Sequence, residues 1–492
     1  MGRLVILFPV VGYLLFTILL ALWCRKSMAK TESSHGFIEE YFIGGRSMGG
    51  FVLAMTVIAT YTSASSFVGG PGVAYTLGFG WVLLAMIQVP TAFLTLGVLG
   101  KRFAILGRKI KAVTITDFLY ARYKNDTTVI LCSVAMLVFF MASMLAQFIG
   151  GGRVFQAVTG YSYETGLIIF GLSVVIYTSV GGFRAITVTD ALQGMVMVVA
   201  SVVVLVAVLD AGGGVEKCIQ TLKAADPGLL TPTGAGGKIP GPFLFSFWIL
   251  VGLGILGLPQ TAQRCFGYKN SKAMHDAMIV GTLIIGFILL CTHLTGALGR
   301  AVLPGLTSGD LVMPTLTVEL LPPIWAGVFV AGPLAAIMST VDSMLLLVSA
   351  AIVKDLYIRY KLKGDTSRAD PRKISRMSLG CTLVAGFLVF LAAFNPPDLL
   401  VWINLFAFGG LEAVFLWPIV LGLYWKKANA TGTVFSIITG LTVFMLLSIT
   451  KWPVFELHPI VPTLAAAFIA FCIGVGMGPP SPPEVTRVFW EE

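Results

Sequence analysis

Thirteen apolar runs, most of them close to 20 residues long, constrain this chain more than any other feature of its sequence. A run of about 20 apolar residues is long enough to cross a lipid bilayer as an α-helix. Only 11% of the residues are charged, whereas a soluble protein carries about 25% charged residues. The sequence therefore predicts an all-α polytopic membrane protein with about thirteen transmembrane helices. The runs are 4–23, 50–73, 80–100, 128–149, 163–180, 189–210, 243–263, 276–299, 323–353, 377–394, 398–424, 432–450 and 460–478.

The basic residues are distributed unequally between the two sides of the membrane. With the N-terminus outside and the C-terminus cytoplasmic, 26 of the 33 Lys and Arg residues fall on the inner side, as expected for cytoplasmic loops. The net charge of +10 is therefore a topology signal and predicts no nucleic-acid partner. Because the first run lacks a small-residue cleavage site and is followed by Arg25 and Lys26, we expect a retained helix and no signal peptide.

The chain offers little material for catalysis or for a metal centre. Its seven cysteines are scattered, with Cys218 alone in an outer loop, and its four histidines lack metal-ligand spacing. Its longest extramembrane segments have about 30 residues or fewer, which is too short for an independent catalytic domain. We therefore expect no enzyme and no organic cofactor. A single transmembrane domain, 1–492, is predicted to carry the function among its helices.

Two of the apolar runs are interrupted by residues that disfavour a continuous helix. The second run contains IATYTSASSFVGGPG (58–72), and the seventh contains FWILVGLGILGLPQTAQR (247–264). Matching interruptions in two halves of a chain indicate an inverted-repeat transporter with its binding site at the unwound segments. Because the interrupted runs are five apart, we predict a five-plus-five core. The predicted repeats are 50–210 and 243–425, and the peripheral segments are 1–49 and 426–492.

The first interruption has a chemical explanation. Backbone carbonyls that a helix break frees cost several kcal/mol each if they face lipid, so they are tolerated where they coordinate something. Hard cations prefer oxygen ligands, and carbonyls flanked by Ser and Thr hydroxyls supply them. The alternative interpretation is a glycine-rich packing hinge that binds no ion.

The ninth run carries a second set of oxygen atoms. Ala336, Ser339, Thr340 and Ser343 are spaced at i, i+3, i+4 and i+7 and share one helix face. Small and hydroxyl residues also mediate close helix packing, which is the alternative here. Asp342 on the flank of this stripe favours function, because a carboxylate near mid-membrane costs about 2.5 kcal/mol or more.

Asp190 at the start of the sixth run and Glu412 in the eleventh are further intramembrane candidates. If Asp190 meets Asp342, the two carboxylates need a shared cation or proton to coexist. For Glu412 we leave two interpretations open, a contact with substrate or a hydrogen bond to an adjacent helix.

Several motifs resemble the sodium:solute symporter family over nearly the whole chain. GLIIFGLSVVIYTSVGGFRA (166–185) resembles the first family signature, and AAIMST (335–340) resembles the sodium-binding helix. EYFIGGRSMGGFVLAMT (40–56) and GGLEAVFLWPIVLGLYW (409–425) resemble the branch of the family that carries pantothenate. The resemblance implies a secondary active transporter of the bacterial inner membrane, which couples inward sodium movement to pantothenate uptake by alternating access.

The resemblance also implies site residues. One sodium ion would be held by the carbonyls of Ala59, Thr62 and Ala336 and the hydroxyls of Ser339 and Thr340. A second cation site would use Asp190, Asp342 and Ser343, with Asp342 standing where a hydroxyl is more usual. The substrate pocket would lie beside the sodium, and its implied residues are Ser65, Ser66, Gln88, Gln147, Gln260, Asn404 and Glu412.

Other functions stay open at this point. The same fold and coupling would serve another small polar solute, such as an amino acid, a monocarboxylate or a sugar. A channel or a transporter-like sensor is a more distant alternative. Arg153, Arg264 and Arg300 are three candidates for binding a substrate carboxylate, or for topology or gating. Sodium, a small solute and the lipid bilayer are the expected partners, and no obligate protein partner is implied.

Overall fold

The computed structural model describes residues 2–28, 34–178, 183–365, 370–396, 399–452 and 454–491. Within these ranges the regular structure is helical, and the one β-bridge joins Met48 to Tyr268. The predicted all-α fold is therefore confirmed. Residues 179–182, which belong to the motif at 166–185, lie outside the described residues.

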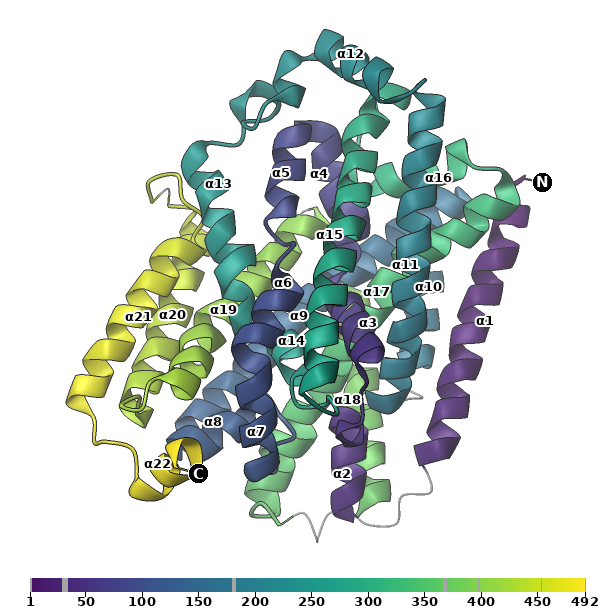
Figure 1. Cartoon of the computed structure of the whole chain (residues 1–492). Coiled ribbons are helices and arrows are strands. Elements are labelled where there is room, and N and C mark those ends of the chain that lie inside the picture. The colour runs from purple at the N-terminus through teal and green to yellow at the C-terminus, as the bar shows by residue number, and fades with distance from the viewer. Residues whose placement is uncertain are drawn as a thin grey trace.

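The helices fall into groups along the chain (Figure 1). The first group is α1 (Gly2–Met28), α2 (Ser34–Ile43), η1 (Gly44–Arg46), α3 (Gly50–Tyr61), η2 (Ser65–Gly69), α4 (Gly70–Leu77), α5 (Phe79–Met86), α6 (Thr91–Leu94), η3 (Thr95–Gly100), α7 (Lys101–Lys109) and α8 (Ile115–Tyr123). The second group is α9 (Asp126–Thr159), α10 (Tyr163–Thr178), α11 (Phe183–Ala211), α12 (Val215–Ala225), η4 (Pro227–Leu230) and η5 (Ala235–Gly237).

The helices of the second half include the second interrupted span. They are α13 (Gly241–Phe247), η6 (Trp248–Leu253), η7 (Gly254–Gly257), α14 (Pro259–Arg264), α15 (Ser271–Val302), η8 (Gly309–Leu311), α16 (Val312–Leu320), α17 (Pro323–Ala350), η9 (Ala351–Lys361), α18 (Pro371–Ala392) and α19 (Leu400–Tyr424). The chain continues through α20 (Ala430–Thr450), α21 (Ile460–Met477) and α22 (Pro483–Trp490).

Several long helices begin at a side chain that satisfies a free backbone N–H group. Asn125, Asn270 and Asn429 each accept a hydrogen bond from the backbone three residues later, at the starts of α9, α15 and α20. Asp370 caps α18 in a similar way, by accepting from the backbone N–H of Arg372. Such caps stabilise a helix by about 1 kcal/mol. They fix where these spans start, next to the polar segments of the sequence.

Ten of the described helices are long and apolar enough to cross a membrane, and the bent pair α3 and η2–α4 raises this number to eleven. Two shorter apolar helices, Tyr163–Val175 and Gly241–Gly257, lie at two further predicted runs. The multi-pass architecture is therefore confirmed, while the count of thirteen crossings stays a prediction.

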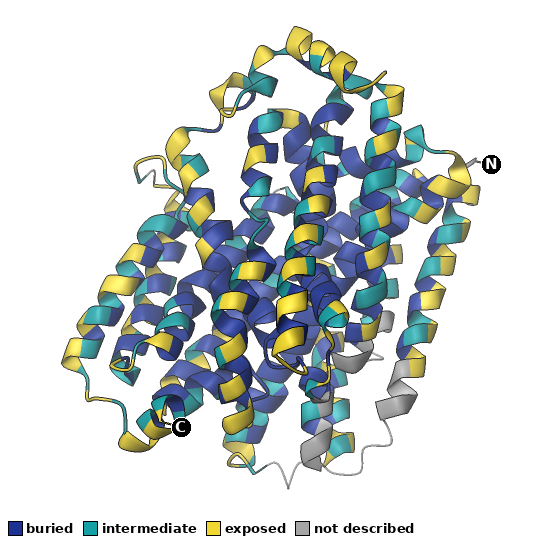
Figure 2. Cartoon of the chain, in the orientation of Figure 1, coloured by how far each residue is buried: buried dark blue, intermediate teal, exposed yellow. Residues whose placement is uncertain are grey.

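The helix α17 lies at the centre of the molecule. In the most apolar window of Pro323–Lys361, 94% of the residues are buried, compared with 28% for Val5–Trp23 in α1. Figure 2 shows the same contrast, with buried residues in the interior and exposed residues on the outward faces of the outer helices. The helices α1, α9 and α11 all pack against α17, so a functional group on α17 is shielded on several sides.

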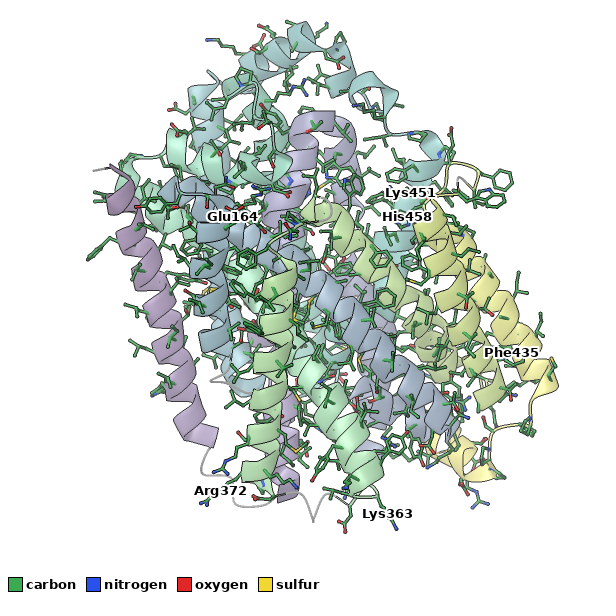
Figure 3. The ribbon with its side chains drawn as sticks, turned by 180° about the vertical axis from the view of Figure 1, so that it is seen from behind. Glu164, Lys363, Arg372, Phe435, Lys451 and His458 are labelled. Carbon is green, nitrogen blue, oxygen red and sulfur yellow. The ribbon has the colours of Figure 1, made fainter. Side chains whose placement is uncertain are left out.

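The two ends of the helical bundle differ in their connections. The N-terminus lies near the end that carries α12, and the C-terminus lies at the opposite end with α8 and α22 (Figure 1). Lys363 and Arg372 lie at the end opposite to Glu164, Lys451 and His458 (Figure 3). Residues that the sequence assigns to loops on different sides of the membrane therefore lie at different ends of the bundle.

Candidate functional site

The first interrupted span breaks at Thr62, where the sequence predicted unwinding. The helix α3 ends at Tyr61, Thr62 is extended (φ −75°, ψ 111°), and the chain resumes as η2 and α4 at an angle of 69°. The Gln147 Oε1 atom accepts a hydrogen bond of 2.8 Å from the backbone N–H of Ala64. The Ser63 hydroxyl accepts another, of 3.2 Å, from the N–H of Ser65. Buried side chains thus satisfy the donors that the break frees.

The hydroxyl stripe on α17 meets this break. The Ser339 hydroxyl lies 2.9 Å from the Ala59 carbonyl oxygen and 3.2 Å from that of Ala336. The Thr340 hydroxyl lies 3.3 Å from the Thr62 carbonyl oxygen and 2.9 Å from that of Ala336. All five residues are buried, so the structure brings the complete implied sodium-binding set together at one point.

The chemistry of this set fits a small hard cation. Three carbonyl oxygens and two hydroxyl oxygens form the cluster, and hydroxyls can rotate to direct lone pairs at an ion. An alkali cation is held by such neutral oxygen atoms at an unwound helix. Among the described residues, no group of three or more His, Cys, Asp or Glu side chains is placed to hold a metal. The neutral oxygen cluster is therefore suited to a monovalent ion.

A second polar cluster lies one helical turn along α17, and Arg264 is at its centre. The guanidinium Nη2 atom donates to the Ser343 hydroxyl at 2.6 Å and to the Thr60 hydroxyl at 2.7 Å. The same nitrogen lies 3.2 Å from the Asp190 carboxylate, which also accepts a hydrogen bond from Thr56. Arg264 therefore connects α14 to α3, α11 and α17 inside the membrane region.

This arrangement brings together the residues implied for a second cation site. Asp190, Asp342 and Ser343 are all buried around the Arg264 side chain, and Asp342 also interacts electrostatically with Arg264. A guanidinium supplies positive charge to both carboxylates. The side-chain contacts show a basic partner for Asp190, and cation binding at Asp190, Asp342 and Ser343 stays a prediction.

A narrow cavity with a volume of about 40 Å³ lies beside the first break. Of the seven residues implied for the substrate, the structure places Ser65, Ser66, Gln88 and Asn404 in its wall. Gln88 also accepts a 2.9 Å hydrogen bond from the Tyr61 hydroxyl. The wall therefore combines neutral hydrogen-bonding groups with apolar surface, which is typical of a site for a small polar solute.

The other three implied substrate residues lie outside this wall. Gln147 is occupied by the Ala64 amide and by the Ser143 carbonyl, to which it donates at 3.2 Å. Gln260 is buried beside the second break. Glu412 is fully buried against Gly254, and neither of its carboxyl oxygens has a hydrogen-bond partner among the described residues.

None of the three arginines considered for a substrate carboxylate lines the cavity. Arg264 is held in the cluster with Asp190. Arg153 donates to Gln156 and lies over the Tyr163 ring at 4.5 Å. Arg300 donates to the carbonyls of Tyr75 and Thr76. Their contacts connect helices to one another.

Sequence reasoning missed several residues of the cavity. His293 on α15 lies in the wall, and its Nδ1 is 2.8 Å from the Leu289 carbonyl oxygen. An ionisable residue inside an apolar run is itself a functional signal, so the sequence alone could have identified His293 as a site candidate. The aromatic residues Trp81, Phe247 and Phe408 carry no such signal, because aromatic side chains are common throughout the chain.

Comparisons with known proteins find a matching family model and relatives that cover almost the whole chain. A model of the sodium:solute symporter family matches residues 41–440. The sodium/pantothenate symporter of Escherichia coli is 49% identical over 484 residues, which cover 98% of this chain and 99% of that protein. The sodium/pantothenate symporter of Haemophilus influenzae is 49% identical over 473 residues, which cover 96% of each.

A solved structure shares the fold. A Na+-coupled sialic acid symporter in a substrate-bound outward-open state superposes with a TM-score of 0.79, at 20% identity. The match covers 97% of this chain and 99% of that one. At this level of identity the likeness shows the architecture alone.

Proposed function

This chain belongs to the sodium:solute symporter family, and on that premise we propose that it couples inward sodium movement to the uptake of pantothenate by alternating access. The single observation that carries the proposal is the oxygen cluster between the break after α3 and the stripe on α17. Its five residues come from two segments that are distant in sequence, since Ala59 and Ser339 are 280 residues apart.

The coupling follows from where these residues lie. An ion bound between α3 and α17 ties the two elements together, and it favours the conformation in which the carbonyls and hydroxyls converge. A ligand shifts a conformational equilibrium only by its differential affinity for the two states. Sodium and substrate must therefore tighten each other's binding by the same factor. Moving one charge inward across 100 mV adds about 2.3 kcal/mol of driving force.

Pantothenate as the substrate rests on the two relatives that are 49% identical and on the chemistry of the cavity. An amide and two hydroxyls suit the side chains of Gln88, Asn404 and Ser66. The substrate carboxylate would lie at Ser65, where the second half of the broken span begins. A helix N-terminus attracts anions, and the Ser65 hydroxyl has no hydrogen-bond partner among the described residues.

The proposal includes a topology. The N-terminus lies outside and the C-terminus lies in the cytoplasm, since the basic loops would otherwise face outward. Residues 50–210 and 243–425 form the two inverted repeats. The helices α1, α20 and α21 are peripheral to them.

The second cation site is tested by a substitution that removes charge from the Arg264 cluster. Asp342→Asn changes the sodium or pH dependence of uptake if a cation or a proton binds there. If Arg264 alone balances the acidic pair, both dependences stay as in the parent protein while stability falls. Uptake measured across a range of sodium concentrations and pH values separates these outcomes.

The decisive experiment is uptake of radiolabelled pantothenate by proteoliposomes. We expect accumulation with an inward sodium gradient and none when potassium or choline replaces sodium throughout. Competition by a panel of amino acids, monocarboxylates and sugars tests the alternative substrates. Accumulation that is independent of sodium overturns the coupling, and competition by another solute in place of pantothenate overturns only the substrate.

A further inference from the structure

A large cavity lies at the end of the molecule that carries the C-terminus, away from the sodium cluster. It has a volume of about 630 Å³ and is lined by residues of α8, η9 and α22. The helices α8 and α22 lie at the C-terminal end of the molecule (Figure 1). No residue of α3, α4 or α14 lines it. Under the proposed topology this basal cavity opens on the cytoplasmic side. It is therefore separate from both interrupted spans.

The charged residues of the basal cavity are mostly basic. Among the described residues that line the cavity, Lys111, Lys124, Lys354 and Arg359 face two carboxylates, those of Asp117 and Glu484. Four cations against two anions leave an excess of positive charge in a concave site, which attracts anions.

Both carboxylate oxygens of Asp117 already accept hydrogen bonds inside the protein. Its Oδ1 atom accepts from Lys354 at 2.9 Å and from Arg359 at 2.8 Å. Its Oδ2 atom accepts from the backbone N–H groups of Val113 and Thr114. Burial alone would raise the pKa of Asp117, but Lys354 and Arg359 bring the pKa below its ordinary value. The carboxylate thus stays ionised and positions both cations on the cavity wall.

The contacts with Asp117 do not use all the N–H groups of the basic residues. The Arg359 guanidinium lies over the Tyr120 ring at 4.2 Å, and its Nε atom is buried with no hydrogen-bond partner among the described residues. Lys111 and Lys124 are exposed at the cavity rim. The exposed ammonium groups of Lys111 and Lys124 can therefore contact an anion that enters the cavity.

The uncharged part of the wall indicates what kind of anion fits. Ile110, Val113, Ile358 and Val485 contribute apolar surface beside the cations. A phosphate group pairs well with Arg and Lys, while the apolar wall accommodates an attached carbon skeleton. The combination favours an organic phosphate over an inorganic ion.

We propose that the basal cavity binds a phosphate-bearing organic anion from the cytoplasmic side, and that this anion slows transport by holding η9 against α8 and α22. The effect on transport rests on the proposed function, whereas the binding does not. The helix η9 continues directly from α17, which carries Ser339 and Thr340. An anion that restrains η9 therefore acts on the sodium-binding helix.

Binding can be tested with the full chain in nanodiscs of phosphatidylcholine, with phenyl phosphate as the probe and calorimetry as the measurement. The test variant is Lys111→Gln with Lys124→Gln. The matched control is Lys426→Gln with Lys427→Gln, because these exposed lysines lie in the loop between α19 and α20 and do not line the cavity. We expect the test variant to weaken binding at least about tenfold and the control to leave it unchanged.

A second arm distinguishes a soluble anion from a lipid headgroup. Thermal stability is compared in nanodiscs with and without phosphatidylglycerol. Stabilisation by phosphatidylglycerol that is lost in the test variant and kept in the control assigns the phosphate to lipid. If neither phenyl phosphate nor phosphatidylglycerol distinguishes the two variants, the proposal is overturned.

The transport arm uses right-side-out membrane vesicles loaded with phenyl phosphate. We expect the initial rate of sodium-driven uptake to fall at least about twofold in the parent protein and to be unaffected in the test variant. Equal rates in loaded and empty vesicles, together with measurable binding, overturn the regulatory part. Loss of uptake in empty vesicles of the parent protein counts against the proposed function and not against the cavity.

Discussion

Both interrupted spans break a transmembrane helix, but the side chains around the two breaks differ. The first break places hydroxyl residues around Thr62, and its free amide groups are bound by Gln147 and Ser63. The second break, at Leu258 (φ −89°, ψ 109°), follows a stretch from 247 to 257 that contains no hydroxyl residue. Interruption alone therefore does not make an ion site, because the surrounding side chains decide whether freed carbonyls can coordinate a cation.

The second break contributes close packing and a positive charge. Its glycines allow η7 to lie against α19, and its C-terminal helix α14 presents Arg264 to the first half of the chain. We therefore propose that the first break binds the ion, while the second connects the oxygen cluster to the rest of the core. The four predictions below test this division of roles.

The largest effect is expected from removing the charge that connects the two breaks. Arg264→Gln leaves Asp190 buried without its ion-pair partner, which costs about 3–5 kcal/mol of stability. Thermal unfolding in detergent should show this loss, and uptake should fall with it. The same substitution at Arg300 is the control, because Arg300 is partly exposed and donates to the backbone carbonyls of Tyr75 and Thr76 rather than to a buried carboxylate.

A double variant distinguishes the ion pair from a packing effect. Adding Asp190→Asn to Arg264→Gln removes the unpaired charge, so most of the lost stability should return. If the double variant is no more stable than Arg264→Gln alone, the bridge between the breaks is not electrostatic.

The next effect tests the first break as an ion site. Replacing both hydroxyls, by Ser339→Ala with Thr340→Ala, removes two of five proposed ligands. We expect the sodium concentration for half-maximal uptake to rise about 10- to 100-fold, which corresponds to about 1.4–2.8 kcal/mol. Ser349→Ala is a matched control on the same helix, because that buried hydroxyl bonds only to the Leu346 carbonyl. If the folded double variant keeps the sodium dependence of the parent protein, the sodium ion does not bind at this position.

The sequence predicted those features of the two breaks that depend on residues close together in the chain. Both breaks and the α17 stripe are local patterns, since Gly, Pro and hydroxyl residues act within a few positions. They were predicted correctly, and so was the helical fold. Four substrate candidates were also placed in the cavity wall.

The rest depends on contacts between residues that are distant in sequence. Arg264 and Asp190 are 74 positions apart, and no local pattern pairs them. The family resemblance implied Gln147 in the substrate pocket, but its position opposite Ala64 is set by the packing of α9 against the break. Partner identity in a helical bundle follows from three-dimensional packing, which one sequence alone does not specify.

The glycines of the second break provide a smaller effect of a different kind. A Cβ atom added at Gly257 would lie 2.8 Å from the Leu416 backbone nitrogen, which cannot move aside as a flexible side chain does. Gly257→Ala should destabilise the protein by about 1–3 kcal/mol. Gly252→Ala is the control, because its nearest neighbour is 3.8 Å away. Equal stability of the two variants, measured by thermal unfolding, would contradict close packing as the role of this break.

The smallest effect concerns the side chain that holds the first break open. Gln147→Leu leaves the Ala64 amide without its acceptor, which costs about 1 kcal/mol. Because the neighbouring Thr62 carbonyl belongs to the proposed ion site, the half-saturating sodium concentration should rise about threefold to fivefold. Ser143→Ala is the comparison, since it removes a hydrogen bond to Asn404 but keeps the backbone carbonyl that Gln147 binds. If both variants shift the sodium dependence equally, the geometry of the break does not depend on Gln147, and its carbonyls must be oriented by α17 alone.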